Sequence, residues 1–200
     1  MKMSALDRAL LLLTCLLAAY QIVVGIDKLS STPIIAYTIG FGVLLLSALL
    51  LFILGFGVLD NSIVVIISTI IPLSISTGLI WEHLASYRTF YLIFAIVGFL
   101  AVILTRSMQT PTNLRMTVLA IVHGISGLII FLLPILLSIY RRTSPDFALV
   151  GVGGALMGLE GLILSFSKFQ ALVSKETVRR FLPWLLLITT VCFVAGFKLG

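Results

Sequence analysis

Seven long apolar runs, separated by short polar segments, are the feature that most constrains this sequence. Each run comes close to the roughly 20 apolar residues that a helix needs to cross the hydrocarbon core of a membrane. Because lipid cannot hydrogen-bond to the backbone, helices are the expected form of these runs. The polar–apolar alternation that a strand barrel requires is absent. The runs are Ala9–Ile26, Ile34–Leu59, Ser62–Trp81, Thr89–Thr105, Met116–Tyr140, Phe147–Phe166 and Phe181–Phe197.

The composition agrees with a membrane protein. The chain is 60% hydrophobic and 10% charged, with a mean hydropathy of +1.26, whereas about a quarter of the residues of a soluble domain are charged. The first run follows Lys2 and Arg8 but lacks a clear small-x-small cleavage site, so it is expected to be a retained helix. We predict an all-α, multi-pass integral membrane protein, a bundle of about seven transmembrane helices in a single domain over residues 1–200.

The basic residues predict the orientation of the bundle. Their net excess of +6 lies in the gaps between apolar runs, which favours the anionic inner leaflet as partner and argues against nucleic acid. One side of the membrane would receive eight of them and the other five, so the N-terminus is expected in the cytoplasm. Four aromatic residues would then form a belt near the outer interface. These are Trp81, Tyr87, Tyr91 and Tyr140.

Small residues form a stripe along the sixth run. They recur at spacings of three and four, so they share one face of a helix. Such stripes let helix backbones approach closely in lipid. We therefore predict a helix-packing seam, which places this helix at the centre of the bundle. The stripe consists of Gly151, Gly154, Gly158, Gly161 and Ser165.

The same run contains one acid, Glu160, which flanks the glycine stripe. If the fifth and sixth helices form an antiparallel hairpin, Glu160 lies at the depth of Ser126 and about one turn from His123. We predict a hydrogen-bonded cluster of Glu160, His123 and Ser126. It is interpreted as polar glue between two helices or, alternatively, as a proton- or ion-responsive site.

No cofactor or metal site is predicted. Cys15 and Cys192 lie within apolar runs and are interpreted as small buried hydrophobes. His83 and His123 would lie too far apart in depth to ligate one haem iron, and the "WEHLASYR" segment supplies too few ligands to specify zinc. Hydrolase and nucleotide-binding motifs are absent.

Two weaker patterns remain open. The segment "SKFQALVSKETVRR" is interpreted either as a short helix on the inner membrane surface or as a solvated loop. "STP" at Ser31–Pro33 and "TSP" at Thr143–Pro145 align Ala36 with Ala148 and Gly42 with Gly154. This match is interpreted as chance similarity between apolar helices, with parallel three-helix repeats as the alternative.

The favoured function is a non-enzymatic accessory or assembly subunit that packs against other proteins in a membrane complex. Further copies of the chain are the other expected partner, and a homo-oligomer would favour the alternative function. The alternative is a small-solute or proton-coupled transporter that uses the Glu160/His123 pair. An intramembrane enzyme acting on lipid is poorly supported, because no nucleophile or metal set accompanies the acid.

Overall fold

The computed structural model describes residues 3–26, 29–108, 110–168 and 175–200, without the side chains of residues 60, 162–168 and 175–179. These residues form seven long α-helices and three short 3₁₀ turns, and no strand occurs among them. The long helices are α1 (Ala5–Val24), α2 (Ser31–Leu54), α3 (Ser62–His83), α4 (Arg88–Ser107), α5 (Thr112–Ile139), α6 (Ala148–Lys168) and α7 (Lys175–Leu199). The turns are η1 (Phe56–Asp60), η2 (Ala85–Tyr87) and η3 (Pro145–Phe147). This confirms the predicted all-helical bundle.

The helix boundaries follow local signals. Ser4 caps α1, because its hydroxyl accepts the N–H of Asp7 over 3.1 Å while the Asp7 carboxylate accepts the N–H of Ser4 over 2.9 Å. This reciprocal pair is a capping box. The second apolar run was expected to continue to Leu59, but α2 ends at Leu54. Gly55 follows with φ 76°, a backbone angle that glycine adopts readily, and the chain turns into η1.

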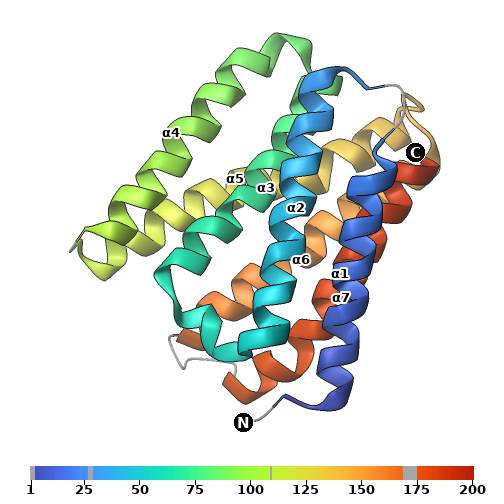
Figure 1. Cartoon of the computed structure of the whole chain (residues 1–200). Helices are drawn as coiled ribbons and strands as arrows, with labels where there is room; N and C mark the ends of the chain where they lie inside the picture. The colour runs from blue at the N-terminus through green and yellow to red at the C-terminus, as the bar shows by residue number, and fades with distance from the viewer. Residues whose placement is uncertain (1–2, 27–28, 109, 169–174) are drawn as a thin grey trace.

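Six helices form a closed ring in the order α1, α2, α3, α5, α6 and α7, with α7 packed against α1. α4 lies at the outer edge of the bundle, against α3 and α5 (Figure 1). The two termini lie at opposite ends (Figure 1). The cytoplasmic location of the N-terminus stays a prediction.

Aromatic side chains fill the middle of the ring. Phe41 of α2 makes edge-to-face contacts with Phe193 and Phe197 of α7, with ring centroids 6.4 and 6.1 Å apart. Tyr37 packs on Phe197 at 4.6 Å. Phe41 and Phe193 are at most 1% exposed. The ring therefore encloses a packed apolar core.

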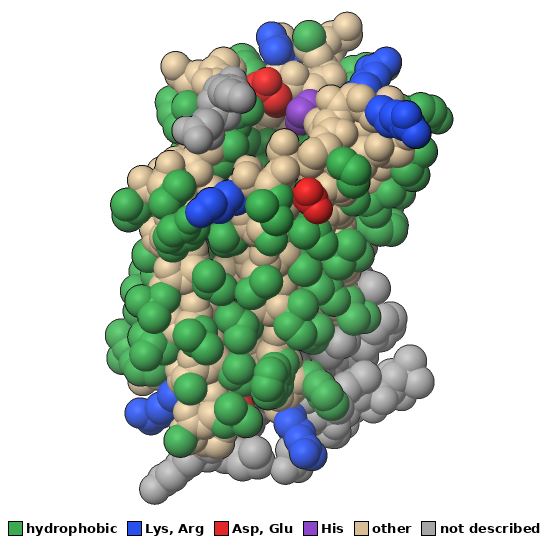
Figure 2. All heavy atoms as spheres, turned by 90° about the vertical axis from the view of Figure 1, so that its right-hand side faces the viewer, with side chains coloured by type: hydrophobic (Ala, Val, Ile, Leu, Met, Phe, Trp, Pro, Cys, Tyr) green, Lys and Arg blue, Asp and Glu red, His purple; other side chains and the backbone are tan. Residues whose placement is uncertain are grey.

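The outer surface is apolar over the middle of the bundle. Figure 2 shows hydrophobic side chains across the middle of one face, with charged side chains toward its two ends. Six described helices are long and apolar enough to cross a membrane: α1, α2, α3, α4 with η2, α5, and α7 from Arg180. This surface indicates an integral membrane protein that crosses the bilayer several times.

The helix pairs α2–α3 and α6–α7 pack in the same register. Gly40 of α2 lies against Ile75, as Gly153 of α6 lies against Phe193. Gly78 of α3 lies against Tyr37, as Gly196 of α7 lies against Val150. The two α2 residues are separated from their α6 counterparts by the same number of positions in the sequence, and the two α3 residues are likewise equally far from their α7 counterparts. The α2–α6 separation is one residue longer than the separation in the "STP"/"TSP" match. That match is therefore out of register with the packing.

Candidate functional site

Glu160 lies on the side of α6 that faces α7. Gly153, which occupies the same face of α6 two turns earlier, packs against Phe193 of α7. Glu160 is 8% exposed, and the Thr189 hydroxyl of α7 donates a hydrogen bond to its carboxyl oxygen over 3.4 Å. A charged side chain at this depth costs at least about 2.5 kcal/mol. The acid is therefore a candidate functional residue or a polar contact between two helices.

Ser126 of α5 belongs to a different polar group. Its hydroxyl is hydrogen-bonded to the phenol oxygen of Tyr91 over 3.1 Å, and this phenol is bonded to Ser76 of α3 over 2.7 Å. Both serines are fully buried and Tyr91 is 5% exposed. Ser76 also donates to the Leu73 carbonyl over 3.1 Å. We call Ser76, Tyr91 and Ser126 the tyrosine bridge, because Tyr91 links α3, α4 and α5.

The sequence analysis placed Tyr91 in an interfacial belt, and its burial in the tyrosine bridge corrects that prediction. Tyr91 is in the first turn of α4 and heads a stripe of buried residues on the helix face toward α3 and α5. Its spacing relative to small residues in that stripe is the signal that could have located it. The other members of the stripe are Ala95, Gly98, Val102 and Thr105.

His123 of α5 takes part in neither group. Its side chain is half-buried, and its Nδ1 atom is buried without a hydrogen-bond partner in the described part of the chain. The predicted pairing of levels along the antiparallel α5 and α6 helices holds approximately, since Gly154 of α6 lies against Ile130 of α5. Yet Ser126 bonds to α4 and Glu160 to α7. The structure thus places the three predicted residues at similar depth without joining Ser126 and Glu160, and a function for them stays a prediction.

The predicted glycine stripe divides into a filled part and an open part. A methyl group at Gly151 or Gly154 would lie 2.6 Å from an atom of α5, so α5 and α6 approach closely there. Gly158 and Gly161 are exposed. No described atom lies within 4 Å of a methyl group placed at Gly158. The Ser165 side chain lies outside the described residues, as do residues 169–174 of the "SKFQALVSKETVRR" segment, whose first two residues end α6 and whose last six begin α7.

Two further glycines extend the open part onto α5. Gly127 and Gly124 lie on the face of α5 that contacts α6 at Ile130 and Phe131. They precede those contact residues by about one turn and about two turns. Neither has a described atom within 4 Å of an added methyl group. We call Gly124, Gly127 and Gly158 the open glycine groove. The two α5 glycines lie outside the predicted stripe, which consists of α6 residues alone.

The end of the bundle that carries the C-terminus is rich in cation–aromatic contacts. Arg88 donates its Nε hydrogen to the Trp81 carbonyl over 2.6 Å and lies 5.6 Å from the Trp81 ring. Lys198 is hydrogen-bonded to the Tyr20 hydroxyl and lies 5.0 Å from that ring. His83 packs edge-on against Phe147 at 5.4 Å. Such contacts, in which a cation lies on an aromatic ring, suit side chains at a membrane interface.

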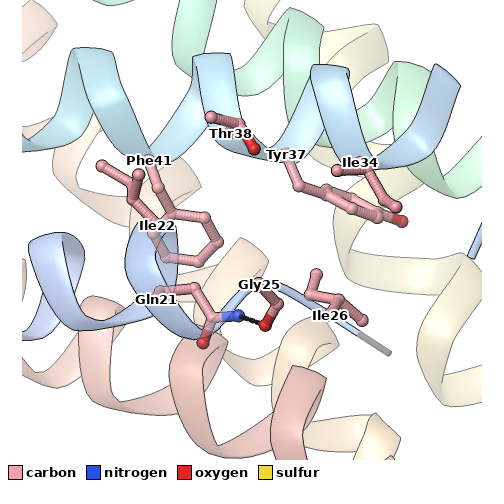
Figure 3. Close-up of a pocket in the computed structure, with 8 residues that line it drawn as sticks. All are labelled: Gln21, Ile22, Gly25, Ile26, Ile34, Tyr37, Thr38 and Phe41. Carbon is pink, nitrogen blue, oxygen red and sulfur yellow. Dashed lines mark hydrogen bonds between the residues drawn. The ribbon is translucent and has the colours of Figure 1, made fainter. Parts of the chain in front are cut away.

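A shallow pocket lies between α1 and α2, near the same end (Figure 3). Gln21 projects toward it from α1 and donates to the Gly25 carbonyl over 2.9 Å, as the dashed line in Figure 3 shows. Ile22, Tyr37 and Phe41 line much of the rest. The pocket has room for about one water molecule, so it is too small for an organic ligand.

Glu160 with Thr189 and the tyrosine bridge are hydrogen-bonded side-chain contacts between helices inside the described bundle, and His123 adds a buried nitrogen. A search of the described residues finds no group of three histidine, cysteine or acidic side chains placed to hold a metal ion. Any assignment of function must rest on the geometry of these groups and of the open glycine groove. Comparison with protein-family models, with curated proteins and with solved structures finds no significant match to the chain.

Proposed function

We propose that the chain is a non-enzymatic accessory or assembly subunit, which packs against a transmembrane helix of another membrane protein. The observation that carries this proposal is the open glycine groove between α5 and α6. Gly124, Gly127 and Gly158 have open space around them in the described structure. The partner helix would lie along this groove.

The filled part of the seam shows how such a contact works. At Gly151 and Gly154 the α5 backbone approaches so closely that no larger residue fits. Helices in lipid associate through this kind of contact, because lipid removes the hydrophobic drive between them. The open glycine groove continues the same two helix faces with the same residue type, so it offers a second helix a similar close approach.

The free-energy cost of glycine within a helix also supports a partner helix at the groove. A glycine inside a helix costs about 1 kcal/mol relative to alanine. At Gly154 the close packing against Ile130 accounts for that cost. At Gly124, Gly127 and Gly158 no described contact does so, and a helix of a partner protein would supply it.

Native mass spectrometry of the protein, extracted from its own membranes in mild detergent, tests the proposal. We expect foreign chains at fixed stoichiometry, and we expect Gly158→Leu to lose them because its side chain would occupy the groove. Gly42→Leu is the matched control, since Gly42 of α2 also has open space and lies outside the groove. A lone chain or a homo-oligomer in the unmodified protein would contradict the accessory role.

A second candidate function rests on Glu160. A buried intramembrane acid that contacts a hydroxyl on a neighbouring helix would suit a small-solute or proton-coupled transporter, with His123 at similar depth. Uptake into vesicles containing the purified chain tests this function. Transport that Glu160→Gln abolishes and Gly42→Leu leaves intact would favour it over the accessory role.

A further inference from the structure

Two arginines lie at the turn where α4 ends and α5 begins. Arg106 lies in the last turn of α4, and its Nε atom is buried without a hydrogen-bond partner in the described structure. Arg115 lies in the first turn of α5 and donates from Nε and Nη2 to the Thr110 carbonyl, over 2.9 and 2.7 Å. Arg115 is thus held in place by the connecting loop, while the Nε of Arg106 is enclosed by the protein and the exposed part of its side chain can meet a ligand.

The charges at this place are uncompensated. Arg106 lies within electrostatic reach of Arg115 and also of His123. The hydrogen bonds of Arg115 go to a neutral carbonyl, and neither arginine pairs with an acid among the described side chains. Like charges repel, and a buried N–H donor without a partner is unfavourable. An anion bound by the exposed parts of the two guanidinium groups would offset the repulsion between them.

The surroundings indicate which anion fits. α5 begins after Pro111 without a side-chain cap, so the positive end of its helix dipole adds to the two arginine charges. Exposed apolar side chains lie within two positions of each arginine along the chain. They are Leu104, Met108 and Leu114. Guanidinium groups match phosphate oxygens in geometry, and apolar neighbours suit acyl chains.

We propose that Arg106 and Arg115 bind the phosphate group of an anionic phospholipid, whose acyl chains lie along the exposed apolar side chains of α4 and α5. Basic pockets between transmembrane helices are suited to such headgroups. A free phosphate ion would make the same contacts with the arginines but none with the apolar side chains. The site is independent of the partner helix proposed above.

Native mass spectrometry of the purified full chain, titrated with phosphatidylglycerol, tests this site. We expect saturable binding in the unmodified protein and about a tenfold weaker affinity in Arg106→Gln and in Arg115→Gln, since each change removes a charged donor. Arg106→Lys keeps the charge but removes the planar guanidinium fork that matches phosphate oxygens, so it too should weaken binding. Thermal unfolding of each variant in the same detergent reports whether it is folded.

Arg142→Gln is the matched control, because Arg142 is exposed at the opposite end of the bundle. Unchanged binding in both Arg106 variants, or an equal loss in Arg142→Gln, would overturn the site. Equal affinity for phosphatidylcholine would overturn the preference for an anionic lipid. Competition by inorganic phosphate separates the two sources: displacement of the lipid at millimolar phosphate would support a free anion, and its absence supports the phospholipid.

Discussion

The phenol oxygen of Tyr91 lies 3.1 Å from the hydroxyl oxygen of Ser126, and this hydrogen bond ties α4 to the closed ring of helices. Among the described long helices, α4 packs mainly on α3 and α5. Tyr91 reaches both, since it is also bonded to Ser76 of α3. The attachment of the outermost helix therefore depends on a polar contact as well as on its stripe of small residues.

Tyr91→Phe should lower the stability of the bundle. The change keeps the ring but removes two buried hydrogen bonds, and hydrogen bonds between transmembrane helices contribute about 1 kcal/mol or less each. We expect a loss of about 1 kcal/mol in the free energy of unfolding, measured by denaturant titration in detergent. Tyr140→Phe serves as the control, since Tyr140 is 72% exposed. Equal losses in the two variants would show that the bridge contributes nothing.

Much of the fold could be predicted because it depends on hydropathy alone. Each of the seven apolar runs became a helix, with boundaries that differ by a few residues. The largest differences have local causes. α2 ends early because Gly55 adopts a positive φ, which hydropathy does not report. α7 begins earlier than its apolar run, since the polar residues from Lys175 continue the helix.

The level of the candidate site residues along the helices could be predicted, but the neighbouring helix that each of them faces could not. Counting residues along the α5–α6 hairpin placed Glu160 near the level of His123 and Ser126, and the contact of Gly154 with Ile130 agrees with that count. The order of helices around the ring decides which neighbour each face meets. That order places α7 beside Glu160 and α4 beside Ser126. A single sequence does not specify the order of the helices around the ring.

Gly154→Leu and Gly158→Leu should behave in opposite ways. A methyl group at Gly154 would lie 2.6 Å from Ile130, so the larger side chain should force α5 and α6 apart and cost about 1 to 3 kcal/mol. Gly158 has open space, so its variant should fold as the unmodified chain does but lose the proposed partner. Thermal unfolding of both purified variants checks the first difference. If both variants are equally stable, the division of the seam into filled and open parts is wrong.

Glu160 and Thr189 should be weakly coupled. Their hydrogen bond is long, at 3.4 Å, and measured couplings between transmembrane helices average about 0.6 kcal/mol. A double-mutant cycle with Glu160→Leu and Thr189→Val isolates this interaction from the other effects of each change. We expect a coupling of about 0.5 kcal/mol. Additive losses would mean that the contact does not stabilise the α6–α7 pair.

The N-terminal end of the bundle should face the cytoplasm. Arg8, Arg106 and Arg115 lie toward that end, together with the basic residues at the end of α6 and the start of α7, whereas fewer basic residues lie at the opposite end. Retention of basic segments on the cytoplasmic side makes this the favoured orientation. Single cysteines in place of Ser4 or Tyr140 test this orientation, since both of these residues are exposed. The two native cysteines are first removed by Cys15→Ala and Cys192→Ala. In intact cells an impermeant maleimide should label Tyr140→Cys alone, and Ser4→Cys only after permeabilisation. Labelling of Ser4→Cys in intact cells, with Tyr140→Cys protected, would reverse the topology and place the Arg106/Arg115 site on the outer leaflet.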